Sequence, residues 1–534
     1  MEINYSGKSA LIVDSKLEDL GSLRQILGNL GVGSIQVSSS VNMALSLMRE
    51  IPFDLCFSCY DMGSNEKNGL QLLQEAKSEG IFNNSGAFFL TVSEQNSELL
   101  FGSLENSPDT YISKPYDAGK VRFRVEKQLR IKESVRSVEL FLDKREFAEA
   151  IEAVEGLQRK FPGLQVYLQR LKGIALLKMG ENEQAKKLFE VLTEHREMPW
   201  AEVGKGIAYF KMGRFEESLE CLNRVVDQQH VCVEAYTWLS RAYKIKGEFE
   251  RAVTLMRKAV MLQPTVPVLQ GELAELATQT QEWDISKAGY KQAIKYARYS
   301  AFQIPENYFG LAKALIESNM GKLDQVEPEI IRLLEDVVID FSENEEIIFR
   351  AKLVNSDIYR KEVQTERLQQ MVLQTWRFFQ RMELDNQCKW IDVMLEIALE
   401  TSIYEEVSEK RRELSRKIIE LDWGKANYTA MSSYRKGNLE QAYLLFLKAH
   451  QLLPGHSGIA LNLLQTGVEL LKKGDGDSET VFTLQEVLSI IYFGSLSDKQ
   501  RLRFGELSRR LAEIIETKSW AGSDKYDDPF SQEL

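Results

Sequence analysis

Residues 53–59 read FDLCFSC, a short apolar run with the length of a buried strand that ends at Cys59. Three more runs of this kind are SALIVDS at 9–15, AFFLTVS at 87–93 and TYISKP at 110–115. Amphipathic stretches lie between them, such as DLGSLRQILGNLG at 19–31 and NGLQLLQEAKSEG at 68–80. Apolar runs that alternate with helical patterns predict an α/β doubly wound domain, in which helices cover both faces of a parallel sheet.

The candidate site lies at the strand ends. In a doubly wound sheet the working residues sit at the carboxyl ends of the strands. Four residues of this sequence fall there: Asp14, Cys59, Thr91 and Lys114. Residues 30–35, LGVGSI, are interpreted as a loop after the first helix, and their G-x-G lacks the third glycine at the start of a helix that dinucleotide binding requires.

Composition and charge narrow the functional classes. The 534-residue chain has 79 acidic and 67 basic residues, and the net charge of −12 disfavours direct nucleic-acid binding. No window approaches eighteen uninterrupted apolar residues, so we expect no membrane insertion, and the N-terminus lacks the features of a secretory signal. The five cysteines are scattered and odd in number, which indicates a reducing compartment and a cytoplasmic protein.

A different rhythm begins near residue 131. Small residues recur with spacings of 33, 34 and 34 at Gly173, Gly206, Ser240 and Ala274. A turn residue follows each of them seven positions later, at Gly180, Gly213, Gly247 and Gln281. Then come a second small residue and a large apolar one, as Ala185 and Phe189, Ser218 and Leu222, Ala252 and Met256, and Ser286 and Tyr290. This pattern predicts helix pairs that approach closely at the small residues and fill the remaining gaps with the large ones.

These residues resemble tetratricopeptide (TPR) repeats, whose period is about 34 residues. The resemblance covers most of 131–300, and SYRKGNLEQAYLLFLKAHQLLP at 433–454 is a further strong copy. It implies an all-α superhelical array with a groove that binds a protein partner. We predict TPR-like repeats over 129–300, divergent helical repeats over 301–422, a TPR-like repeat with capping helices over 423–517, and a disordered acidic tail over 518–534.

The N-terminal residues resemble the receiver domain of bacterial two-component response regulators, and we place a receiver-like, flavodoxin-like domain at 1–128. In that family two acids after the first strand and an aspartate after the third hold Mg²⁺, and the latter aspartate accepts the phosphoryl group. Asp14 matches the first acid, Thr91 the hydroxyl residue, and Lys114 the lysine of the family's Lys-Pro pair. Tyr111 matches the aromatic residue that reports phosphorylation.

Two positions depart from the family pattern. Ser15 stands where the second acid is expected, and Cys59 stands where the acceptor is expected. Because Mg²⁺ prefers carboxylate oxygens to a thiol, this pocket should hold it poorly. We therefore predict a degenerate pocket without metal, cofactor, phosphotransfer or other enzymatic activity. Cys59 beside Lys114 is either a redox-sensing thiolate or, on the simpler interpretation, an inert buried thiol.

The register leaves one alternative open. Asp61 lies two residues beyond Cys59, and its distance to Gly69 (69 − 61 = 8) is the family's spacing from acceptor to glycine. The spacing from Asp14 to Cys59 (59 − 14 = 45) instead fits the ungapped family pattern, and the apolar strand ends at Cys59. If Asp61 were the acceptor, the protein would bind Mg²⁺ and be a phosphorylation-switched regulator with a protein-binding output.

The sequence favours a non-catalytic signalling scaffold. The TPR-like repeats would recruit a protein partner, and the receiver-like domain would act independently of phosphorylation as a docking or homodimerisation module. Residues 117–141, DAGKVRFRVEKQLRIKESVRSVELF, are predicted to form one long helix that connects the two parts.

Overall fold

The computed structural model describes residues 4–63, 66–93, 104, 107–194, 197–228, 232–298, 300–361, 365–399, 401–474, 476, 478–491, 496 and 498–517. The tail predicted to be disordered, 518–534, lies outside them. The chain divides into two compact units, which are described separately below. One comprises residues 1–211, 215–244 and 249–307, and the other comprises residues 212–214, 245–248 and 308–534.

The first unit begins with a parallel sheet. Its strands are β1 Ser9–Val13, β2 Ser34–Ser38, β3 Leu55–Cys59, β4 Ala87–Ser93 and β5 Thr110–Lys114, in the order β2-β1-β3-β4-β5. The register places Val13 beside Ser58 and Cys59 beside Thr91. All neighbouring strands run parallel, so the carboxyl ends of the strands meet at one edge of the sheet.

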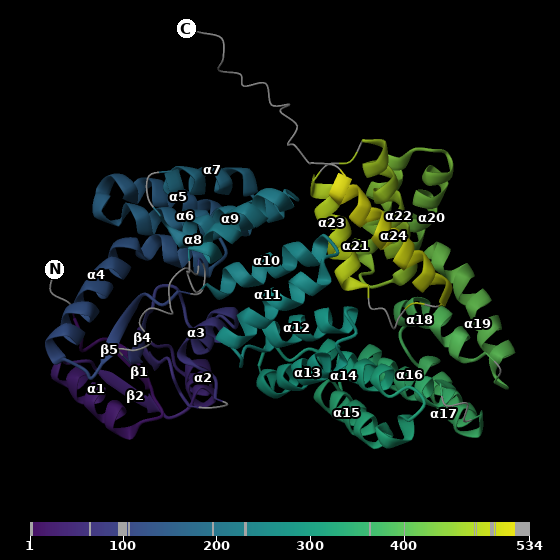
Figure 1. Ribbon diagram of the computed structural model, residues 1–534, viewed down its shortest axis with the longest axis horizontal. Helices are drawn as coiled ribbons and strands as arrows, with labels where there is room; N and C mark the ends of the chain where they lie inside the picture. The colour runs from purple at the N-terminus through teal and green to yellow at the C-terminus, as the bar shows by residue number, and fades with distance from the viewer. Residues whose placement is uncertain are drawn as a thin grey trace, which may run out of the picture. The chain divides into compact units, whose positions relative to one another are not determined.

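Helices cover both faces of this sheet (Figure 1). They are α1 Leu17–Asn29, α2 Val41–Glu50, α3 Gly69–Ser78 and the first half of α4 Ala118–Asp143. Residues of α1 and α4 pack with Ile12 and Phe57 on one face, and residues of α2 and α3 pack with Leu11 and Leu90 on the other. The predicted doubly wound, flavodoxin-like fold is therefore confirmed.

One strand was missed in the sequence. Part of LGVGSI, interpreted above as a loop, belongs to β2, which begins at Ser34. This strand lies at the sheet edge and alternates exposed Ser34 and Gln36 with half-buried Ile35 and Val37. It has no continuous apolar run, because only one of its sides pairs with another strand and it is exposed to solvent.

The predicted connecting helix is present as α4, which has 26 residues. Val121 and Val125 in its first half belong to the core of the sheet. Val135 and Val138 in its second half belong to a core shared with the next helices. The boundary predicted near residue 128 thus falls inside a helix that serves two hydrophobic cores.

Helix pairs follow α4. They are α5 Phe147–Lys160, α6 Gln165–Met179, α7 Asn182–Glu194, α8 Pro199–Lys211, α9 Phe215–Asp227, α10 Val233–Ile245, α11 Phe249–Leu262, α12 Pro267–Gln279 and α13 Trp283–Ala297, with the 3₁₀ turn η2 Pro162–Leu164 before α6. The small residues sit where the pairs touch: a Cβ on Gly173 would lie 2.5 Å from the Phe189 ring. Gln281 has a φ of +59° at the position where earlier turns carry glycines with positive φ. The predicted TPR-like array is confirmed.

Every regular element that the structure describes in the second unit is an α-helix or a 3₁₀ turn. Its elements are α14 Pro305–Ser318 (which begins in the first unit), η3 Leu323–Gln325, α15 Glu327–Asp340, α16 Glu345–Lys361, α17 Thr365–Phe379, α18 Leu384–Ile397, α19 Tyr404–Lys417, η4 Ile418–Glu420, α20 Asp422–Arg435, α21 Leu439–Leu452, α22 Ser457–Lys473, α23 Ser478–Ile490 and α24 Asp498–Thr517. Stacked Trp376 and Phe379 rings lie in its core. The repeat copy at 433–454 forms the end of α20 and all of α21, with the turn at Gly437. Across the described residues of both units, no helix combines the length and apolarity that crossing a bilayer requires.

Candidate functional site at the strand ends

Three predicted residues converge at the carboxyl edge of the sheet. Asp14 directly follows β1, Cys59 ends β3 and Lys114 ends β5. The Lys114 ammonium Nζ lies 2.5 Å from Asp14 Oδ2 and 3.2 Å from Cys59 Sγ. Lys114 therefore donates to a carboxylate and a thiol on strands distant in the sequence.

Sequence reasoning missed a second carboxylate, Asp19. It lies in the first turn of α1, and its Oδ2 accepts a hydrogen bond from Lys114 Nζ at 2.8 Å. Burial alone would lower the pKa of Lys114, but its bonds to Asp14 and Asp19 raise that pKa overall. The acidic first turn of a helix that begins directly after β1 was the available signal. The pocket thus holds one ammonium group between two carboxylates.

Asp14 is fixed by the backbone around it. Its side chain is 2% exposed, and Oδ1 accepts a hydrogen bond from the Lys16 N–H at 3.0 Å. The Asp14 N–H donates to the Ser38 carbonyl oxygen, which ties the end of β1 to β2. Ser15, predicted at the place of a second acid, is exposed to solvent.

The remaining predicted pocket residues lie on the neighbouring strands. Thr91 is 1% exposed and pairs with Cys59 in the sheet register. The hydroxyl of Tyr116, just beyond β5, interacts with Thr91, and burial is the main reason that the pKa of Tyr116 is raised. Tyr111 packs against the core on the α2 and α3 face, and burial raises its pKa to about 12. Tyr111 is therefore half-buried rather than displayed on the surface.

Asp61, the alternative acceptor, lies in the loop after β3. Its side chain is exposed, and its Oδ1 accepts a hydrogen bond from the Gly63 N–H at 3.0 Å. Its carbonyl oxygen accepts a hydrogen bond from Cys59 Sγ at 3.1 Å. Gly69 at the start of α3 approaches the end of β3 so closely that a Cβ would lie 2.6 Å from the Cys59 carbonyl oxygen. The two candidate acceptors are thus close in sequence, while Cys59 Sγ is the one bonded to Lys114.

The surroundings of Cys59 favour the protonated thiol, because they raise its pKa. Burial raises its pKa first, and the negative charge of Asp14 raises it further. The nearby Lys114 lowers the pKa, but by less than these two effects raise it. A thiol with a raised pKa is a poor nucleophile and a poor metal ligand at neutral pH.

The pocket residues do not fit Mg²⁺. Both carboxylates already bind the Lys114 ammonium group, and the third group is a protonated soft sulfur. Mg²⁺ requires oxygen ligands in octahedral geometry. Among the residues that the structure describes, no group of three or more His, Cys, Asp and Glu side chains is placed to hold a metal ion.

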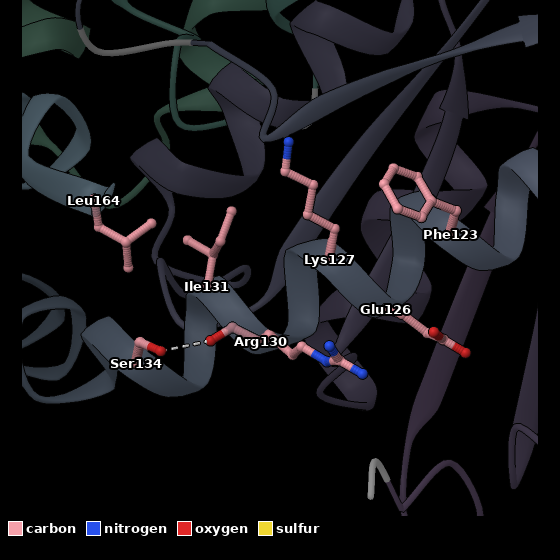
Figure 2. Close-up of a pocket in the computed structure, with 7 residues that line it drawn as sticks. All are labelled: Phe123, Glu126, Lys127, Arg130, Ile131, Ser134 and Leu164. Atoms are coloured by element: carbon pink, nitrogen blue, oxygen red, sulfur yellow. Dashed lines mark hydrogen bonds between the residues drawn. The ribbon is translucent and has the colours of Figure 1, made fainter. Parts of the chain in front are cut away.

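The surface of the first unit also has two hollows outside this pocket. One, of about 330 Å³, lies along α4, and Figure 2 shows Phe123, Lys127 and Ile131 lining it with Leu164 of η2. The other, of about 700 Å³, lies among α7, α8 and α9 and is lined mainly by side chains of both charges. Neither hollow includes Asp14, Cys59 or Lys114.

Comparison with known proteins supports the assignment of tetratricopeptide repeats in the first unit. Residues 203–267 match the tetratricopeptide repeat family. The phagocyte signaling-impaired protein of Drosophila pseudoobscura pseudoobscura is 27% identical over 181 residues, a match that takes in 29% of this chain and 19% of that protein. This chain therefore spans less than a fifth of that relative.

Solved structures resemble separate parts of the chain. The C-terminal part of a TPR repeat-containing protein from Cytophaga hutchinsonii is 14% identical, with a TM-score of 0.38, and the match covers 47% of this chain and 96% of that one. MamA from Desulfovibrio magneticus RS-1 is 21% identical, with a TM-score of 0.28 and coverage of 31% and 94%. The signal receiver domain of an HD domain-containing protein from Pseudomonas fluorescens Pf-5 is 20% identical, with a TM-score of 0.21 and coverage of 26% and 96%.

Proposed function

We propose that this protein is a non-catalytic adaptor that binds a protein partner through its TPR-like repeats, and that its receiver-like domain works without being phosphorylated. Stacked helix pairs present an extended surface on which a peptide or a partner helix can lie. The match of residues 203–267 to the tetratricopeptide repeat family supports this role for the repeats.

The ion cluster around Lys114 supports the proposal that the receiver-like domain works without being phosphorylated. Its ammonium group lies between the carboxylates of Asp14 and Asp19 and contacts Cys59 Sγ. Transfer of a phosphoryl group needs a cation that neutralises the developing charge and a reactive nucleophile that accepts the group. A protonated thiol is not such an acceptor, so the domain would act through protein contacts.

One competing function has a specific observation in its favour. The Asp61 carboxylate is exposed in the loop directly after β3, where an external phosphodonor can reach it. Phosphorylation there would make the protein a switch with a protein-binding output. The two functions differ in whether phosphate is incorporated and whether partner binding changes with it.

The test is to incubate the full chain with acetyl phosphate and Mg²⁺, then to measure its intact mass and its captured partners from the native cell. We expect no stoichiometric phosphate adduct and the same captured proteins with and without the phosphodonor. Asp61→Ala is the matched variant, and it should behave like the unaltered chain. A phosphate adduct that Asp61→Ala abolishes would establish the switch and refute a phosphorylation-independent domain.

A further inference from the structure

Leu104, which lies in the chain between β4 and β5, binds the helix pairs through both of its backbone polar groups. Its carbonyl oxygen accepts hydrogen bonds from Arg170 Nε at 3.0 Å and Nη2 at 2.7 Å. Its N–H donates to Glu234 Oε2 at 2.6 Å. The Leu104 side chain is completely buried. One residue of the receiver-like domain thus forms hydrogen bonds with charged side chains of α6 and α10.

The Arg170 side chain, which binds the Leu104 carbonyl oxygen, packs against an aromatic ring of a neighbouring helix. The Arg170 guanidinium lies over the Trp200 ring of α8, at 5.6 Å from the ring centroid. Trp200 in turn packs edge-to-face on Phe189, with 6.3 Å between centroids. Arg170, Trp200 and Glu234 lie on α6, α8 and α10, the first helices of successive pairs, and Arg170 interacts with both of the other side chains.

We propose that Arg170, Trp200 and Glu234 form a clamp for the backbone of an extended peptide, and that Leu104 occupies this clamp in the free chain. Arg170 donates to a backbone carbonyl oxygen and Glu234 accepts from a backbone N–H, and every residue except proline has both groups. The buried site of the Leu104 side chain selects a residue of similar size and apolarity. The partner is therefore an extended segment with one exposed aliphatic residue. The inference rests on the proposed function, because it names the site on the repeats where a partner binds.

Occupation by Leu104 makes the clamp autoinhibited. A tethered segment competes with a free peptide as if it were present at a concentration on the order of millimolar. A partner peptide must displace Leu104, and this breaks the hydrogen bonds of that residue to Arg170 of α6 and Glu234 of α10. Partner binding and release of Leu104 are then the same event.

The probe is a fluorescent peptide with the chain's own residues 101–107, FGSLENS, and fluorescence polarisation measures its binding to the full chain. The unaltered chain should bind it at least tenfold more weakly than Leu104→Gly, because glycine removes the buried side chain that holds the backbone of residue 104 in the clamp. Adding Arg170→Ala or Glu234→Ala to Leu104→Gly should weaken binding at least tenfold. Adding Arg257→Ala, on the exposed side of α11, should leave it unchanged.

A peptide in which glycine replaces the leucine should not bind Leu104→Gly. If Leu104→Gly fails to fold by circular dichroism, Leu104→Ala replaces it with the same expected order of affinities. The proposal is wrong if a folded Leu104 variant binds the peptide no better than the unaltered chain, or if Arg170→Ala has no effect. The peptide needs neither a native partner nor a phosphodonor, so its result is independent of the adaptor test.

Discussion

At the scale of single residues, the chemistry expected of the pocket at the strand ends depends on Cys59. The strand register places it beside Thr91, and its Sγ contacts the Lys114 ammonium at 3.2 Å. Lys114 lowers the thiol pKa, but burial and Asp14 together raise it by more. The balance of these effects is what separates an inert thiol from a redox sensor.

The resulting prediction concerns alkylation of Cys59. Because its pKa is raised, the thiolate fraction is small at pH 7 and increases as the pH rises. Native chain treated with iodoacetamide should therefore react slowly at Cys59 at pH 7 and faster toward pH 10, as quantified by peptide mass spectrometry. In urea all five cysteines should react, because burial protects each of them in the native state. Fast native labelling of Cys59 at pH 7 would instead support the redox sensor.

The pocket could be predicted from the sequence only in part. The structure brings Asp14, Cys59 and Lys114 together, because each ends or directly follows a strand of one parallel sheet. Asp19 was missed because it reaches the pocket from a helix turn, where strand patterns give no information. Arg170 was not foreseen as a ligand of Leu104, since the two are 66 positions apart and the contact depends on how the repeats curve.

At the scale of elements, the helix pairs depend on close approach at small residues. A Cβ on Gly173 of α6 would lie 2.5 Å from the Phe189 ring, and Phe189 has no exposed surface. Gly156 in α5 is exposed and has no atom within 4 Å of such a Cβ. Both glycines thus lie within helices, but Gly173 is closely packed and Gly156 is not.

Alanine at these two positions should change stability in opposite directions. Gly173→Ala should lower the free energy of unfolding by about 1–3 kcal/mol, because the ring must shift within a packed core. Gly156→Ala should raise it by about 0.5–1 kcal/mol, because alanine restricts the unfolded chain and favours helix. Chemical denaturation followed by circular dichroism measures both. An equal effect of the two substitutions would contradict the packing described for α6 and α7.

The strands and helices could be predicted where burial leaves a regular pattern of apolar or small residues in the sequence. β1, β3 and β4 are covered on both faces and appear as continuous apolar runs, whereas edge strand β2 has polar alternation and was read as a loop. The TPR-like pairs were recognisable because their small and large residues recur at fixed spacing. Gln281 shows that the turn geometry tolerates a residue other than glycine, since it keeps a φ of +59°.

At the scale of the molecule, α4 joins the receiver-like domain to the first helix pairs within one compact unit. The Lys132 ammonium in its middle forms ion pairs of 2.8 Å with Asp109, directly before β5, and with Glu139 of α4. It also donates to the Asn84 carbonyl oxygen at 2.6 Å, and Tyr167 of α6 donates to Glu139 at 2.9 Å. The boundary predicted at residue 128 falls inside α4, and the contacts of Lys132 are one of the links between the strand ends and α6.

The last prediction is that Lys132→Met destabilises the sheet and the first helix pairs together. It leaves Glu139 buried and Asp109 half-buried without their cation, which should cost about 3–5 kcal/mol. Burial already raises the pKa of Glu139 to about 7, so the loss should be smaller at pH 6, where most of Glu139 is protonated, than at pH 8. Hydrogen exchange should accelerate in β4 and β5 as well as in α5 and α6. Arg122→Met, which removes an exposed ion pair on the same helix, is the control and should leave exchange unchanged. Acceleration confined to the sheet or to the helix pairs would show that α4 does not couple them.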